Sequence, residues 1–110
     1  MRRCLIAILS PTRPATLERA EILTARDCEE AARRLTLKAA PDHLTATTTK
    51  LEGSRLCEEE RVGRYLELIR NDLAEATAEP ADLRGCWDYL GVLPDGGRKR
   101  WLVLAFKTRR

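Results

Sequence analysis

The sequence predicts an α+β fold: one small domain spanning residues 1–110, with an antiparallel or mixed sheet of four to five strands, two helices on one face and a C-terminal β-hairpin. Three observations predict it. A continuous apolar run near the N-terminus is typical of a buried strand. Two central segments repeat apolar residues at helical spacing. The last thirty residues hold two apolar runs on either side of a Pro-Asp-Gly-Gly turn.

The first two predicted strands lie between the N-terminus and residue 25. Residues 3–9 form an apolar run that Ser10-Pro11 ends, and an uninterrupted run suits a strand covered on both faces. Two prolines make 11–14 a loop. Residues 17–25 alternate and favour a strand that returns against the first. A helix stays open there, because three apolar residues recur at a spacing of three: Leu17, Ala20 and Leu23.

The first predicted helix follows directly. Asp27 is placed to cap its first amides, and Glu30, three residues later, can reach back to the chain before the helix. Pro41 limits this helix. One face carries its apolar residues: Cys28, Ala31, Leu35 and Ala39. Residues 43–51 are rich in threonine and alternate, which predicts a strand that faces solvent.

The second predicted helix begins after Ser54, a residue suited to the N-cap, and ends before Pro80. Acidic residues 58–60 occupy its first turns, where the helix dipole favours negative charge. Glu60 and Arg64 are spaced for an ion pair. The apolar stripe follows the helical period: Val62, Tyr65, Leu66, Ile69, Leu73 and Ala76.

The predicted hairpin has arms at 86–93 and 98–107, and we expect Leu93 to pair with Arg98. In that register both faces of the hairpin are apolar, so something other than the helices must cover the second face. We expect a partner or a second copy to do so. The candidate interface residues are Trp87, Tyr89, Leu102, Leu104 and Phe106. A slip of one residue would exchange residues between the faces.

The charge is distributed unevenly. The net charge is +3, but residues 4–97 hold 12 basic and 17 acidic residues, a net charge of −5. The remaining positive charge lies at the two ends of the chain, starting with Arg2 and Arg3. Such a distribution favours phosphate backbones or acidic surfaces as partners. The candidate residues for binding a partner or nucleic acid are Arg98, Lys99, Arg100, Trp101, Lys107, Arg109 and Arg110.

The four cysteines are spread evenly and form no C-x-x-C pair, and one histidine cannot complete a zinc-finger pattern. We therefore expect no metal and no cofactor. The apolar run 4–9 is shorter than the core of a signal peptide. No apolar run reaches the ~18 residues of a membrane span. These features predict a cytoplasmic protein with reduced cysteines and no membrane partner.

No nucleotide-binding, protease, hydrolase or calcium-binding motif occurs in the sequence. We therefore expect no enzymatic activity. A Cys57–His43 nucleophile pair stays open, because such partners need only be close in space. An alternative role for Cys57 is as filler in the first turn of a helix.

The run from Arg100 to Arg110, preceded by Leu83-Arg84-Gly85, resembles the last strands of the RelE/ParE toxin superfamily over about a quarter of the chain. The resemblance implies a small toxin directed at the ribosome or gyrase. Its chemistry would fall to Arg98, Lys99, Arg100 and Tyr89. The helix order departs from that family, whose two helices precede the sheet.

Two functions of different classes follow. The first is a non-enzymatic binding protein, a homodimer of the kind that phages and mobile elements use to bind and inhibit a host protein or nucleoprotein complex. The second is a RelE/ParE-like or other nucleic-acid-binding, RNA-cleaving protein that uses the basic hairpin. The exposure of Trp101 separates them, because only an exposed ring can stack on bases.

Overall fold

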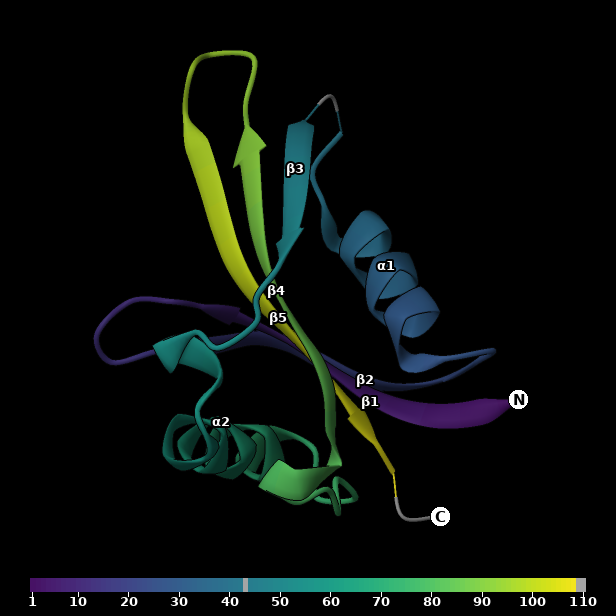
Figure 1. Ribbon diagram of the computed structural model, residues 1–110. Coiled ribbons are helices and arrows are strands. Elements are labelled where there is room, and N and C mark those ends of the chain that lie inside the picture. Colours follow the sequence, from purple (N-terminus) through teal and green to yellow (C-terminus); the bar gives the residue numbers. More distant parts are fainter. Residues whose placement is uncertain (43, 109–110) are drawn as a thin grey trace.

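The computed structural model describes residues 1–42 and 44–108, and in this part of the chain five strands form one antiparallel sheet in the order β2-β1-β5-β4-β3 (Figure 1). The predicted α+β class and C-terminal hairpin are confirmed. The elements, in chain order, are β1 (Arg2–Ser10), β2 (Thr16–Ala25), α1 (Cys28–Ala39), β3 (Thr45–Lys50), the 3₁₀ turn η1 (Arg55–Cys57), α2 (Glu59–Asp72), the 3₁₀ turn η2 (Pro80–Asp82), β4 (Leu83–Val92) and β5 (Arg98–Lys107).

The two helices lie on opposite faces of the sheet, so the prediction that they share one face is wrong (Figure 1). Side chains alternate along β1: Cys4, Ile6 and Ile8 pack with α1. Leu5, Ala7 and Leu9 pack with α2. The unbroken apolar run of this strand therefore has a direct cause, because a helix covers it on each side.

Residues 17–25 are a strand, as their alternation favours. β2 pairs with β1 along its whole length, with an irregularity between Ile8 and Leu9 at which Glu18 is the extra residue. A bulge of this kind re-aims side chains at the edge of a sheet. It allows Glu18 to reach toward β5.

The predicted cap of α1 is confirmed. The Asp27 carboxylate accepts a hydrogen bond from the amide of Glu30 at 2.8 Å. Glu30 reaches back as expected, but to the amide of Arg26 at 3.0 Å. The first bond satisfies an amide that the helix start would otherwise leave without a partner, and the second ties the residue before the cap to the first turn.

The second helix is shorter than predicted. Ser54 caps the 3₁₀ turn η1 instead, through the amide of Leu56, and Glu58 takes the N-cap of α2. The helix ends at Asp72, and the following chain turns to bury Ala76 and Ala78. Arg70 holds this return, because its guanidinium donates to the carbonyl of Ala78 at 2.6 Å. The predicted Glu60–Arg64 ion pair forms, at 3.6 Å.

The hairpin register differs from the prediction by one residue. Val92, rather than Leu93, pairs with Arg98. Leu93 bonds Gly97, and the amide of Gly96 reaches the carbonyl of Leu93, which leaves a three-residue loop with Gly96 at a φ of 87°. A type I turn followed by a left-handed glycine is a common three-residue loop, and here it shifts the pairing by one residue from the predicted register.

The cysteines are not all reduced, in contrast to the prediction. Cys57, beside α2, and Cys86, on β4, form a disulfide, while Cys4 and Cys28 are free and buried. Burial and the neighbouring Cys28 thiol raise the pKa of the Cys4 thiol to about 12. None of the helices in the described part of the chain is both long enough and apolar enough to cross a bilayer.

Candidate functional site

The predicted basic residues of the hairpin do not converge on one site. Successive side chains of a strand point to opposite faces, so Lys99 lies on the α1 side of the sheet and Arg100 on the α2 side. Lys99 pairs with Glu18 at 3.8 Å, and Arg100 pairs with Asp88 at 3.0 Å. Two of the three predicted cations are therefore held by carboxylates of the chain itself.

Trp101 is buried, with 4% of its surface exposed. Its ring stacks on Tyr89 with centroids 5.0 Å apart, its indole N–H donates to Glu18, and the Lys99 ammonium lies 5.3 Å from the ring centroid. These contacts engage the ring that would stack on a base. Burial also raises the pKa of Tyr89.

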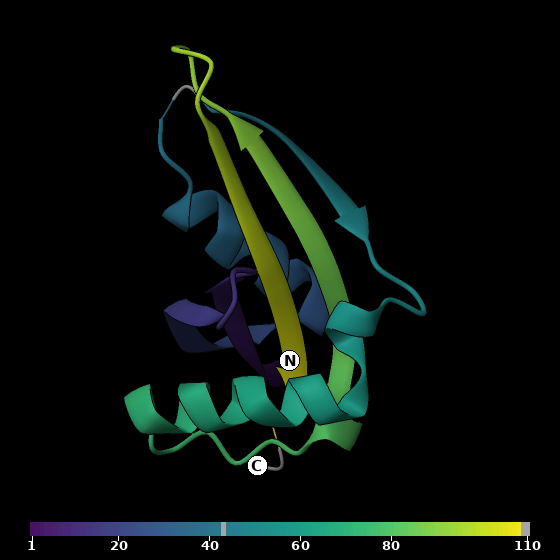
Figure 2. The ribbon, with the colours of Figure 1, turned by 90° about the vertical axis from the view of Figure 1, so that its left-hand side faces the viewer.

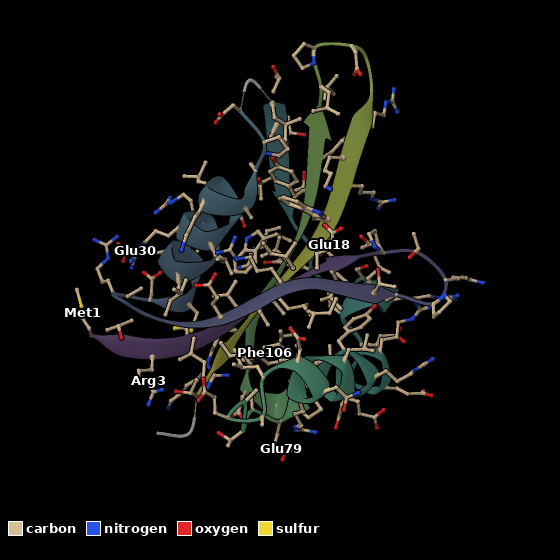
Figure 3. All side chains as sticks on the ribbon, turned by 180° about the vertical axis from the view of Figure 1, so that it is seen from behind. Met1, Arg3, Glu18, Glu30, Glu79 and Phe106 are labelled. Atoms are coloured by element: carbon tan, nitrogen blue, oxygen red, sulfur yellow. A yellow bond between two sulfur atoms is a disulfide. The ribbon has the colours of Figure 1, made fainter. Side chains whose placement is uncertain are left out.

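A hollow of about 360 Å³ opens beside this cluster, between the start of β2 and the end of α1. It is lined by Ile8, Thr16, Leu17, Glu18, Arg19, Ala39 and Trp101. Glu18, labelled in Figure 3, lies where β2 passes the hairpin. Its carboxylate already accepts a hydrogen bond from Trp101 and pairs with Lys99. The carboxylate of this lining is therefore already engaged within the chain.

The candidate interface residues do not form one exposed patch. Trp87 and Tyr89 are buried against α1, whereas Leu102, Leu104 and Phe106 are buried against α2. The one-residue difference in register places them on different faces, because paired residues share a face. A helix of the same chain thus covers the part of the second hairpin face that these three residues form.

The sheet does remain open at its other end. The β4–β5 hairpin and β3 extend beyond α2, and Figure 2 shows this part of the three strands with no helix in front of it. We call this surface the uncovered face. Its exposed or half-buried residues are Thr45, Thr47, Thr49, Asp88, Leu90, Val92, Arg98 and Arg100.

Strand β3 is the edge of the sheet on this side, and all six of its residues are exposed. The other edge, β2, is protected by its bulge and by Arg34, whose guanidinium donates to the carbonyl of Thr24 at 2.9 Å. Among the described residues, no side chain bonds a backbone group of β3. The threonine alternation predicted an exposed strand, but it could not show that this strand ends the sheet.

The amide of Leu51 donates to the carbonyl of Cys86 at 2.8 Å. Hydrogen bonding repeats every second residue in an antiparallel pair, so Thr45, Thr47 and Thr49 direct their backbone groups toward β4. The backbone groups of Ala46, Thr48 and Lys50 therefore point away from the sheet. These groups are available to another strand.

A second exposed feature lies where β1 begins and β5 ends. Antiparallel pairing of these strands sets Cys4 opposite Lys107, as expected if the basic ends of the chain meet. The hairpin cations, however, lie at the far end of β5. Here a groove of about 760 Å³, the terminal basic groove, is lined by Met1, Arg2, Arg3, Asp82, Arg84, Lys107 and Thr108. The predicted residues Arg109 and Arg110 lie outside the described residues.

The catalytic alternative loses its nucleophile in this structure. Cys57 is bonded to Cys86, and a disulfide sulfur is not a thiolate. His43 lies outside the described residues. Within residues 1–42 and 44–108, no three His, Cys, Asp or Glu side chains gather as metal ligands would. The acidic residues 58–60 lie at the start of α2, where the helix dipole favours negative charge.

In comparisons with known proteins, no family model, curated protein or solved structure matches this chain.

Proposed function

We propose that this protein is a non-enzymatic binding protein whose partner adds a β-strand to the free edge of β3. The observation that carries the proposal is the exposure of all six residues of this strand, together with the outward direction of the backbone groups of Ala46, Thr48 and Lys50. Strand addition takes its affinity from such backbone groups and its specificity from neighbouring side chains.

The uncovered face supplies those neighbouring side chains. Leu90 and Val92 offer apolar contact beside the β3 threonines, and Val92 is 42% exposed. Arg98 and Arg100 lie on the same face, on the next strand. A partner strand rich in β-branched residues, with an acidic residue to meet Arg98, is complementary to this surface, because Arg100 is already paired with Asp88.

The burial of Trp101 supports a protein partner over RNA cleavage by the hairpin. The toxin-like function requires Arg98, Lys99, Arg100 and Tyr89 to act together. In this fold Tyr89 is 4% exposed and Lys99 and Arg100 face opposite sides of the sheet. We therefore favour the binding protein.

In this proposal the partner is a host protein or nucleoprotein complex, inhibited in the manner of small phage or mobile-element proteins. What supports this part is the exposed edge of β3, which a strand of a host protein can extend. Self-pairing of β3 between two copies would give the homodimer expected from the sequence, through a different surface from the hairpin face.

A proline at position 48 tests the proposal. Thr48 directs its N–H away from β4, so the Thr48→Pro change removes a donor needed by an incoming strand while leaving the β3–β4 bonds in place. Thr48→Val keeps the N–H and is the matched control. A partner captured on the wild-type protein is purified, and its Kd is measured with all three proteins.

We expect the Thr48→Pro variant to bind the partner about tenfold more weakly or worse, because a hydrogen bond worth about 1 kcal/mol is lost and the ring obstructs the edge. The valine variant should bind as the wild type does. Equal binding by the proline variant would refute strand addition. Light scattering on the same proteins tests self-pairing, since a β3-linked dimer must dissociate in the Thr48→Pro variant and persist in Thr48→Val.

Cytoplasmic action is part of the proposal, and it has its own test. Reductants of the cytoplasm would keep Cys57 and Cys86 apart, whereas an oxidising compartment would preserve their bond. Alkylation during lysis followed by mass spectrometry counts the free thiols. Four thiols per chain support a cytoplasmic location, and two oppose it.

A further inference from the structure

The terminal basic groove is assembled from three strands. β1 supplies Arg2 and Arg3, and β5 supplies Lys107. Thr108 fastens the residue after β5 to β1 here, because both its amide and its hydroxyl donate to the carbonyl of Arg3, at 3.3 and 3.1 Å. Figure 1 shows the N-terminus and the end of β5 on the same side of the molecule, away from the tip of the hairpin.

Arg84 enters the groove because of a bulge. Leu83 pairs with Phe106 and Gly85 pairs with Ala105, so Arg84 is the extra residue of β4. Bulges next to functional sites commonly re-aim one side chain. The Arg84 guanidinium is oriented by the carbonyls of Ala81 and Leu83, which accept from it at 3.3 and 3.4 Å.

The lining is strongly cationic, with three arginines and one lysine against one carboxylate. That carboxylate, Asp82, also accepts a hydrogen bond from the amide of Glu79, at 2.9 Å, in the cap of η2. Arginine presents a planar fork that binds phosphate oxygens in pairs. In the described lining there is no aromatic ring on which a base could stack.

We propose that the terminal basic groove binds the phosphate backbone of a nucleic acid, without preference for base sequence. Three arginines suit phosphodiester groups, and Met1 is the one apolar residue among the described lining residues. The site differs from the predicted hairpin site in every residue except Lys107. It is also separate from the β3 edge that the proposed function uses.

Fluorescence anisotropy with a labelled oligothymidylate of about 12 nucleotides, over a range of KCl concentrations, tests the inference. The groove variant carries Arg3→Gln and Arg84→Gln. The matched control carries Arg98→Gln and Arg100→Gln, which removes the same charge from the hairpin. All four arginines are exposed, and thermal melting checks that both variants keep the fold.

We expect the wild type to bind with a Kd that weakens as KCl rises. The groove variant should lose about tenfold or more in affinity at low salt, and its plot of log affinity against log salt should flatten by about 1.4, the value for two lost phosphate contacts. The hairpin variant should stay within about twofold of the wild type.

Three outcomes would overturn the inference. If the wild type does not bind the oligonucleotide at the lowest salt, the proposed site is refuted. Equal losses in the two variants would show a response to net charge alone. Displacement of the oligonucleotide by polyglutamate as readily as by unlabelled oligonucleotide would assign the groove to acidic proteins instead.

Discussion

The Cys57–Cys86 bond is a residue-scale feature with a large expected effect on stability. It joins the segment before α2 to β4 across 29 residues of sequence. Closing a loop of this length restricts the unfolded chain by about 3–4 kcal/mol in the chain-entropy description. We expect Cys57→Ala, or reduction of the wild type, to lower the free energy of unfolding by up to that amount.

Urea unfolding of the wild type with and without dithiothreitol measures this loss. Cys28→Ala is the control, because that thiol is free and its substitution leaves the bond intact. A urea midpoint that dithiothreitol leaves unchanged would contradict the prediction.

Alkaline pH should act on the buried groups of the α1 side. Burial raises the pKa of the Cys4 thiol from 9.0 to about 12 and also raises the pKa of Tyr89. Both shifts favour the neutral form in the folded state. The stabilising effect of the Cys4 shift is complete below pH 9 and declines between pH 9 and 12, and that of the Tyr89 shift declines above pH 10. We expect the free energy of unfolding to fall across this interval.

The slope of unfolding free energy against pH checks this expectation, measured by urea titration at intervals from pH 8 upward. Cys4→Ala should flatten part of the slope, and the remainder belongs to groups such as Tyr89. The same slope in Cys4→Ala and wild type would exclude the thiol as its source.

At the scale of single elements, the cap of α1 is the simplest to test. Removal of the Asp27 carboxylate leaves the amide of Glu30 without its partner. Asp27→Ala should therefore cost about 1 kcal/mol of stability, while Asp27→Asn, which keeps an acceptor oxygen, should cost clearly less. Thermal or urea unfolding of the two variants decides, and equal losses would assign the effect to charge rather than to the cap.

Element existence was predictable because it depends on local pattern. The apolar run of β1 and the capped start of α1 each have one physical interpretation that neighbours do not override. The pattern of residues 17–25 fitted a strand or a helix, and its pairing with β1 decides for the strand. The ends of elements depend on longer contacts. Ser54 has the side chain of an N-cap, yet it caps η1, and α2 begins only after Glu58. The helix ends at Asp72, and Arg70 bonds the carbonyl of Ala78 in the chain that returns along it.

The hairpin shows why the candidate site could be predicted only in part. Pro94-Asp95-Gly96-Gly97 permits a two- or a three-residue loop by composition, and the choice moves every pairing by one position. This single step divides the expected interface between the two faces. The free edge of β3 and the terminal basic groove required the order of the strands, which no local pattern in this sequence contains.

At the scale of the whole molecule, the two proposed surfaces lie toward opposite ends of the sheet. β5 runs from Arg98 to Lys107, a length of about 30 Å at the usual rise of a strand, and β3 borders only the hairpin half of β4. Sites this far apart that share no side chain should respond to substitution independently.

The combined variant Thr48→Pro, Arg3→Gln, Arg84→Gln tests this independence. We expect its binding free energy for the protein partner to fall by as much as in Thr48→Pro alone. Its binding free energy for the oligonucleotide should fall by as much as in the arginine pair alone, each within about 0.5 kcal/mol. The measurement is a double-mutant cycle on both binding reactions. A larger coupling would mean that one partner spans both surfaces, as a nucleoprotein complex would, with its protein on β3 and its nucleic acid in the terminal basic groove.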